Sequence, residues 1–188
     1  MIGVILAGGK SSRFGEDKSL YVLEGKPMYE HVAESLNKVQ SIDEIVINTN
    51  DKLKTSFKNY KVIVDDPMFI DHGPLGGLYV AAKEYPGESL MIISCDTPYV
   101  DAEWLNILAS EATQTGRTTI TTDQTREHPL IGVYQDDDLA GLLEAQLNTE
   151  KLSLKAFFEN LDVDYLNIES YNLNSTTLIN INRKTDIK

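Results

Sequence analysis

Cysteine is almost absent from this chain of 188 residues, which contains only Cys95. A single cysteine excludes an internal disulfide framework and any metal site made of several cysteines. The apolar run at the start is short: residues 2–7 are too few to span a membrane, and they lack the basic start of a signal peptide. We therefore expect a soluble protein of the cytoplasm.

Positive charge is also scarce, with 17 basic against 29 acidic side chains and a formal net charge of −12. Nucleic acids and anionic membrane surfaces need a basic face, so we expect neither as a partner. The exception is the start of the chain, where residues 1–26 hold four basic and three acidic side chains, whereas the remainder holds 13 and 26. Such a loop can bind a small anion, because local geometry governs a close contact.

The sequence shows no internal repeat, low-complexity tract or long flexible linker. Hydrophobic residues make up 41% and charged residues 24%, which is close to the average of globular proteins. We expect one domain over residues 1–188 with a sizeable buried core.

Short apolar runs alternate with longer amphipathic ones, which predicts an α/β fold around a mainly parallel central sheet. Expected strands are residues 1–6, 44–49, 60–64, 90–94, 118–122, 130–134 and 164–168, and expected helices are residues 27–39, 75–85, 101–113, 137–147 and 153–160. Ligands of such sheets bind beyond the carboxyl ends of the strands. The loops at residues 7–18, 65–74 and 95–100 should therefore border one crevice.

The first of these loops is rich in glycine and charge, and reads LAGGKSSRFGEDK from Leu6 to Lys18. Its paired glycines let backbone N–H groups approach a phosphate, and Arg13 and Lys18 would neutralise a triphosphate. It is not a Walker A loop, because Val4 stands where that motif needs glycine, and the dinucleotide fingerprint G-x-G-x-x-G is absent. The alternative is an ordinary flexible loop.

A carboxylate follows the most apolar expected strand, in the sequence Ser94-Cys95-Asp96-Thr97-Pro98. Asp96 would be well placed to hold Mg²⁺ against phosphate oxygens. The alternative is a helix cap or turn residue. Cys95 has no histidine near it in sequence and is expected to be a small core residue.

Other polar candidates also follow expected strands. The adjacent carboxylates of Asp65 and Asp66 would contact a ribose or a metal, or form a solvated turn with the next residue, Pro67. Gly76-Gly77 inside a helical stretch lowers helix propensity, which indicates close approach of a ligand or of another part of the chain. Asn48 would bind a nucleoside through its amide or simply end its strand. His128, beside Pro129, is either structural or a contact for a second substrate.

The chain resembles the nucleotidyltransferases that make nucleotide diphosphate linkages, and in particular the molybdenum cofactor guanylyltransferases, the MobA family. The resemblance rests on motifs in order along nearly the whole chain: Leu6 to Gly9, Arg13 to Gly15, Asp17-Lys18, Gly73-Pro74-Leu75, Cys95 to Pro98, Glu127 to Leu130, and Leu178 to Asn182. It departs from the family where Arg183 to Asp186 replace a usual Thr-Pro, and where Lys151 and Lys155 stand near an expected arginine.

The resemblance implies a Rossmann-like three-layer fold of the nucleotide-diphospho-sugar transferase type. The implied activity transfers GMP from GTP to molybdopterin, releases pyrophosphate and uses Mg²⁺. The implied nucleotide site comprises Leu6, Ala7, Gly8, Gly9, Lys18, Asn48, Asp65, Asp66 and Asp96. Arg13 and Lys18 would stabilise charge on the pyrophosphate, Asp96 would bind the metal, and His128, Asn180 and Asn182 would lie toward the pterin.

Three alternatives remain at this stage. A related transferase would use CTP, or would use a sugar 1-phosphate as acceptor. A regulatory protein would bind GTP without catalysis. A dehydrogenase is disfavoured by the missing dinucleotide fingerprint. The residues themselves do not choose the base; only the family resemblance does.

Overall fold

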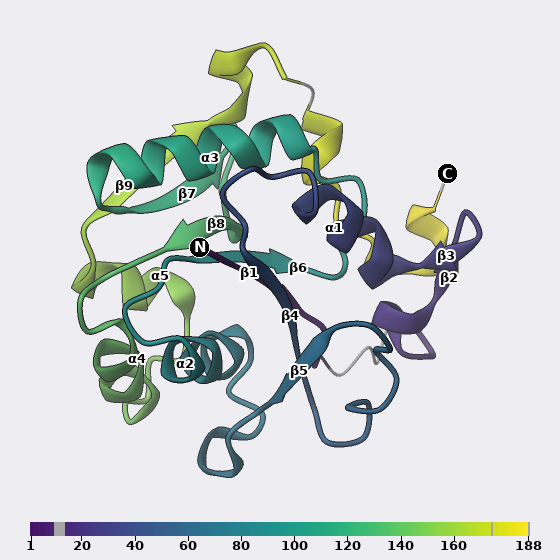
Figure 1. Ribbon diagram of the computed structural model, residues 1–188, viewed down its shortest axis with the longest axis horizontal. Coiled ribbons are helices and arrows are strands. Elements are labelled where there is room, and N and C mark those ends of the chain that lie inside the picture. Colours follow the sequence, from purple (N-terminus) through teal and green to yellow (C-terminus); the bar gives the residue numbers. More distant parts are fainter. Residues whose placement is uncertain (10–13, 174, 188) are drawn as a thin grey trace.

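The computed structural model describes residues 1–9, 14–173 and 175–187, and its centre is a seven-stranded sheet of order β5-β4-β1-β6-β8-β7-β9 (Figure 1). In chain order these strands are β1 (Ile2–Leu6), β4 (Glu44–Thr49), β5 (Lys61–Val64), β6 (Leu90–Ser94), β7 (Thr118–Thr122), β8 (Glu127–Tyr134) and β9 (Val163–Asn167). All neighbours pair in parallel except β8, which runs antiparallel to both β6 and β7. The predicted α/β fold with a mainly parallel sheet is confirmed.

Helices cover both faces of this sheet and make three layers. They are α1 (Met28–Leu36), α2 (Pro74–Glu84), α3 (Ala102–Thr115), α4 (Leu139–Leu147) and the short α5 (Leu154–Phe157). Figure 1 shows α1 and α3 on one side of the sheet and α2 and α4 on the other. Among the described residues, no helix is both long and apolar enough to cross a membrane.

The alternation of side chains along the strands explains the two covered faces. In β1, Ile5 packs in the cluster that includes α1 and α3, whereas Val4 and Leu6 pack in the cluster that includes α2 and α4. The continuously apolar β6 is buried at all five positions for the same reason. Because β1, β4, β5 and β6 run parallel, their carboxyl ends meet at one edge of the sheet.

Strand β8 begins three residues earlier than the sequence predicted, at Glu127 instead of Leu130. Its pairing with β7 shifts register between Ile120 and Thr121, so that Ile120 faces Gly132 but Thr121 faces His128. The extra residues form a bulge around Pro129. A bulge leaves a residue unpaired, so the missing N–H of proline costs no ladder hydrogen bond there. The strand therefore continues through a residue that ordinarily marks its boundary.

The sequence also missed a small hairpin near the start of the chain, made of β2 (Val22–Leu23) and β3 (Lys26–Pro27). Two residues per strand are too few for a periodic pattern. A third hydrophobic cluster joins this hairpin to the last residues of the chain, through Leu23, Met28, Phe14 and Ile181. Figure 1 shows the last segment (yellow) beside β2 and β3 (purple).

Candidate functional site

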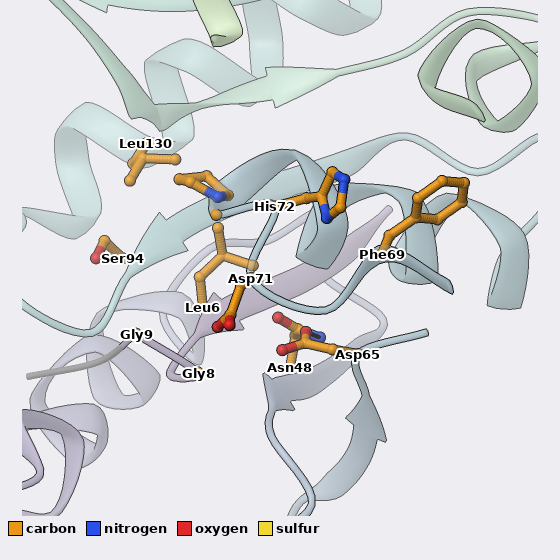
Figure 2. Close-up of a pocket in the computed structure, with 12 residues that line it drawn as sticks. Leu6, Gly8, Gly9, Asn48, Asp65, Phe69, Asp71, His72, Ser94 and Leu130 are labelled. Carbon is orange, nitrogen blue, oxygen red and sulfur yellow. Dashed lines mark hydrogen bonds between the residues drawn. The ribbon is translucent and has the colours of Figure 1, made fainter. Parts of the chain in front are cut away.

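A pocket of about 300 Å³ opens where the four parallel strands end (Figure 2). It is lined by the ends of four strands and their loops (Leu6, Gly8, Gly9, Asn48, Asp65 and Ser94), by the segment before and at the start of α2 (Phe69, Asp71, His72, Gly73 and Pro74), and by Leu130. A second cavity of about 700 Å³ shares Gly8, Gly9, Asp65 and Asp71 with it. Of the three loops predicted to border one crevice, residues 7–18 and 65–74 line both cavities, whereas residues 95–100 line neither.

The first loop starts as a continuation of the sheet. The N–H of Ala7 donates to the carbonyl oxygen of Asn48 at 2.8 Å, and the N–H of Cys95 donates to the carbonyl oxygen of Leu6 at 3.1 Å. Leu6 and Ala7 are consequently buried, whereas Gly9 is exposed. A Cβ atom at Gly9 would meet nothing described within 4 Å, so the described residues leave room at that position.

Asn48 and Asp65 form a hydrogen-bonded pair on one wall of the pocket. The amide nitrogen Nδ2 of Asn48 donates to Oδ1 of Asp65 at 3.0 Å, and Asn48 is only 3% exposed. Burial raises the pKa of Asp65 above its usual value; the hydrogen bond from Asn48 opposes this rise and the charge of Asp71 adds to it. Figure 2 shows the carboxylates of Asp65 and Asp71 near the Asn48 amide, with Ser94 and Leu130 farther along the pocket.

The glycine pair in α2 is explained by this same wall. A Cβ atom at Gly77 would lie 2.3 Å from Oδ1 of Asn48, which is too close for any side chain. A Cβ atom at Gly76 would lie 3.2 Å from the carbonyl oxygen of Phe69. The close approach expected from the sequence is therefore made by Asn48 and by the loop before α2, both of which belong to the pocket.

The neighbouring carboxylate of Asp66 has a different place. Its Oδ1 accepts from the N–H of Met68 at 3.0 Å, and its Oδ2 accepts from Nζ of Lys83 at 3.3 Å. These contacts, the backbone hydrogen bond first, lower the pKa of Asp66. Asp66 lines neither cavity and caps the short helical turn Pro67–Phe69. Of the two adjacent carboxylates, Asp65 is the one that faces the pocket.

Lys18, Asp96 and Asn182 come together from three distant segments. Nζ of Lys18 donates to Oδ2 of Asp96 at 2.8 Å and to Oδ1 of Asn182 at 3.1 Å. The side chains of Lys18 and Asp96 are 16% and 14% exposed, respectively. The other carboxylate oxygen of Asp96, Oδ1, is buried and has no hydrogen-bond partner among the described residues.

Of the two alternatives for Asp96, the structure shows the turn residue and not the helix cap. The turn after β6 is closed by Thr97, whose N–H and hydroxyl both donate to the carbonyl oxygen of Ser94, at 3.2 and 2.7 Å. Helix α3 is capped by Asp101, whose carboxylate accepts from the N–H of Glu103 at 2.8 Å. Asp96 is thus left to face Lys18 and the end of the sheet.

The orphan oxygen of Asp96 suits a divalent cation. Carboxylate oxygen is a ligand that Mg²⁺ prefers, and this ion is commonly held by one or two carboxylates together with substrate phosphates. A buried polar atom without a partner is costly in free energy, which a bound cation would relieve. Within the described part of the chain, no group of three or more His, Cys, Asp or Glu side chains could hold a metal ion. The residues present fit a metal brought with a phosphate.

The candidates for a second substrate lie apart from one another. His128 is 7% exposed, and its Nε2 lies 2.8 Å from Oδ2 of Asp123. Hydrogen bonds from the Thr125 hydroxyl and from His128 hold the pKa of Asp123 well below its usual range. Asn180 is exposed, and Asn182 contacts Lys18 as described above. Arg13, together with Lys10 and Ser11, lies outside the described residues.

The sequence analysis missed Asp71, which lines both cavities. Its φ of +67° is rare for a residue with a side chain, and asparagine and aspartate tolerate this conformation better than most residues. The available signal was an acidic residue two positions before Gly73-Pro74, in the loop already expected to border the crevice.

Comparison with known proteins identifies the type of fold. The fold matches molybdopterin-guanine dinucleotide biosynthesis protein A from Archaeoglobus fulgidus, with a TM-score of 0.83, 24% identity, and coverage of 100% of this chain and 95% of that one. It also matches 4-diphosphocytidyl-2C-methyl-D-erythritol synthase from Anaerococcus prevotii, with a TM-score of 0.74, 14% identity, and coverage of 99% and 92%.

A third similar structure is Rv0371C from Mycobacterium tuberculosis in complex with manganese, with a TM-score of 0.64, 14% identity, and coverage of 89% and 87%. These likenesses show the nucleotide-diphospho-sugar transferase type of fold that the resemblance implied. Residues 3–164 match the family model described as the MobA-like NTP transferase domain. The chain therefore belongs to the family of MobA-like NTP transferase domains.

Proposed function

We propose that this protein transfers GMP from GTP to the terminal phosphate of molybdopterin, forming a guanine dinucleotide cofactor and releasing pyrophosphate. The observation that carries the proposal is the pair of Lys18 and Asp96 at the ends of the parallel strands, with one Asp96 oxygen unpaired among the described residues. Family membership supports nucleotidyl transfer. The choice of guanine and pterin is supported by the name of the Archaeoglobus fulgidus protein.

The nucleoside end of the site is the pocket of Asn48 and Asp65. Leu6, Gly8 and Gly9 line it, and phosphates would follow along the first loop; Ala7 belongs to the same stretch of backbone. The carboxylate of Asp65 is fixed by Asn48 through one oxygen, so its second oxygen is placed to accept hydrogen bonds from a ligand. Asp66, which the resemblance also implied, has no part in this proposal.

The phosphate end is the Lys18–Asp96 pair. In the transfer step an oxygen of the acceptor phosphate attacks the α-phosphorus of GTP, and the bond from that phosphorus to the bridging oxygen breaks. Negative charge then builds on the departing pyrophosphate, where the ammonium of Lys18 stabilises it. Arg13 would add a second positive charge to that of Lys18. Positioning and charge supply most of the catalysis.

No side-chain nucleophile is needed, because the acceptor phosphate is already anionic. Cys95 is not suited to be one: it is 7% exposed, and burial raises the pKa of its thiol far above the usual value. A divalent cation held by Asp96 would neutralise charge on the phosphate oxygens. The manganese in the Mycobacterium tuberculosis protein supports such a cation.

A second candidate is transfer of CMP from CTP, supported by the cytidylyl product named for the Anaerococcus prevotii protein. A panel of GTP, CTP, ATP and UTP with Mg²⁺ separates the two by thermal shift. A ligand at one hundred times its dissociation constant stabilises a protein by about 2.7 kcal/mol, which is readily measured. We expect the largest shift with GTP. A shift with CTP alone would replace guanylyl by cytidylyl transfer, and nucleotide binding without pyrophosphate release on adding acceptor would contradict catalysis.

A further inference from the structure

Residues 181–187 form a strap that packs on the end of the first loop and on the segment that follows it. Ile181 is fully buried with Phe14, Leu23 and Met28. Lys184 forms an ion pair with Glu16 and lies over the rings of Phe14 and Tyr21, at 5.8 and 5.4 Å from their centres.

The strap is also tied to itself. Oδ2 of Asp186 accepts from the N–H of Asn182 at 2.9 Å and from the N–H of Arg183 at 2.8 Å. The backbone of Asn182 is therefore fixed on one side by a carboxylate and on the other by the burial of Ile181. This fixed backbone defines the position from which the Asn182 side chain extends.

The strap forms hydrogen bonds with both members of the Lys18–Asp96 pair. The N–H of Ile181 donates to the carbonyl oxygen of Asp96 at 2.8 Å, and Oδ1 of Asn182 accepts from Nζ of Lys18 at 3.1 Å. The ammonium of Lys18 is thus held between a carboxylate at 2.8 Å and a neutral amide oxygen. A lysine side chain is long and flexible, so a second fixed acceptor restricts where its charge lies.

The neutrality of this second acceptor matters. The ammonium of Lys18 and the carboxylate of Asp96 together carry no net charge, and a second carboxylate in place of Asn182 would make the group net negative. An amide oxygen orients the ammonium by a hydrogen bond and adds no negative charge that would repel an incoming phosphate.

We propose that Asn182 is a positioning residue, whose side-chain carbonyl holds the ammonium of Lys18 in place for the phosphates of the nucleotide. The inference rests on the proposed function, in that phosphate is taken to bind at Lys18. It assigns Asn182 to the nucleotide end of the reaction instead of the pterin end that the sequence resemblance implied.

A double-mutant cycle tests the proposal with wild type, Asn182→Ala, Lys18→Ala and the double variant. The dissociation constant of GTP with Mg²⁺ is measured by calorimetry, and thermal unfolding is measured without nucleotide. We expect Asn182→Ala to weaken binding about threefold to tenfold, as for one hydrogen bond to a charged group, and Lys18→Ala to weaken it at least about tenfold. In the Lys18→Ala background, Asn182→Ala should change binding less than about twofold, because its target is gone.

Equal losses from Asn182→Ala in both backgrounds would overturn the proposal, since a merely structural strap acts whether or not Lys18 is present. Thr185→Ala changes an exposed residue of the same strap and is the matched control. Asn182→Gln shifts the carbonyl by one methylene group and completes the cycle should Asn182→Ala not fold. If wild type binds no nucleoside triphosphate, the proposed function fails and this inference with it; if wild type binds GTP and the cycle is additive, only the inference fails.

Discussion

The two ends of the proposed site each hold a carboxylate against a nitrogen donor, but the donors differ in charge. At the nucleoside end the neutral amide of Asn48 donates to Asp65 at 3.0 Å, and burial leaves the pKa of Asp65 raised. At the phosphate end the ammonium of Lys18 donates to Asp96 at 2.8 Å. One end therefore arranges hydrogen bonds and the other arranges charge, as a nucleoside and a triphosphate would respectively require.

The ends also differ in how they are built. The nucleoside end comes from neighbouring parallel strands and one helix, with Gly77 making room for Asn48. The phosphate end joins three segments far apart in sequence, at residues 18, 96 and 182. Substitutions at the first end should act through packing, hydrogen bonding and the burial of Asp65, and those at the second mainly through charge.

The largest expected effect is at the phosphate end. Asp96→Asn keeps the shape of the side chain and removes its charge, so turnover should fall by about 100- to 1,000-fold. The protein should still fold, because the amide oxygen can keep the hydrogen bond from Lys18 while the NH₂ group replaces Oδ1, which has no partner among the described residues. Pyrophosphate release measures turnover and circular dichroism checks the fold. Asp137→Asn, at an exposed acidic position, is the control; wild-type turnover in Asp96→Asn would remove Asp96 from the mechanism.

A packing change at the nucleoside end comes next. Gly77→Ala places a Cβ atom 2.3 Å from Oδ1 of Asn48, and we expect the free energy of unfolding to fall by about 1–3 kcal/mol. The measurement is urea denaturation. Adding Asn48→Ala removes the clashing oxygen, so the double variant should lose less stability than the sum of the single ones. Strict additivity would show that the two residues do not meet in this way.

Asp65→Asn should affect binding and stability in opposite directions. GTP affinity should fall about threefold to tenfold through the loss of a charged hydrogen-bond acceptor. Because the folded-state pKa of Asp65 is raised, the ionised carboxylate disfavours the folded state, and this penalty grows as the pH rises from the unfolded pKa through the folded one. The midpoint of thermal unfolding of Asp65→Asn should therefore exceed that of wild type at pH 7.

That difference in midpoint should shrink as the pH falls below the ordinary aspartate pKa of 3.8. Thermal scans at pH 7 and near pH 3 provide the check. A variant less stable than wild type at pH 7 would contradict the assignment of burial as the main influence on Asp65.

The smallest effect is expected at the adjacent carboxylate. Asp66→Asn should leave GTP affinity within about twofold of wild type, since Asp66 caps a turn and pairs with Lys83 on the surface. Its pKa is lowered in the folded state, so the small stability that it contributes is present at neutral pH and is lost as the pH falls through the folded pKa. Calorimetry on Asp65→Asn and Asp66→Asn together shows which of the pair meets the nucleotide; a greater loss with Asp66→Asn would reverse the assignment.

Much of the fold could be predicted from the sequence, because apolar periodicity sets the strands and helices of a sheet covered on both faces. The bulge around Pro129 and the two-residue strands could not, since both depend on pairing between segments and not on local pattern. The place of the crevice followed from where the strands end. The choice between Asp65 and Asp66, and the contact between Asn182 and Lys18, required side-chain directions that spacing does not give.

Guanylyl transfer to molybdopterin can be followed through the α-phosphate of GTP. The protein is incubated with Mg²⁺, molybdopterin and GTP labelled at the α-phosphorus, and the products are separated. We expect label in a pterin dinucleotide, an equal amount of pyrophosphate, and transfer by Asp96→Asn that is about 100- to 1,000-fold slower. Label that remains in GTP, or that leaves as free GMP whether or not molybdopterin is present, would contradict guanylyl transfer to the pterin.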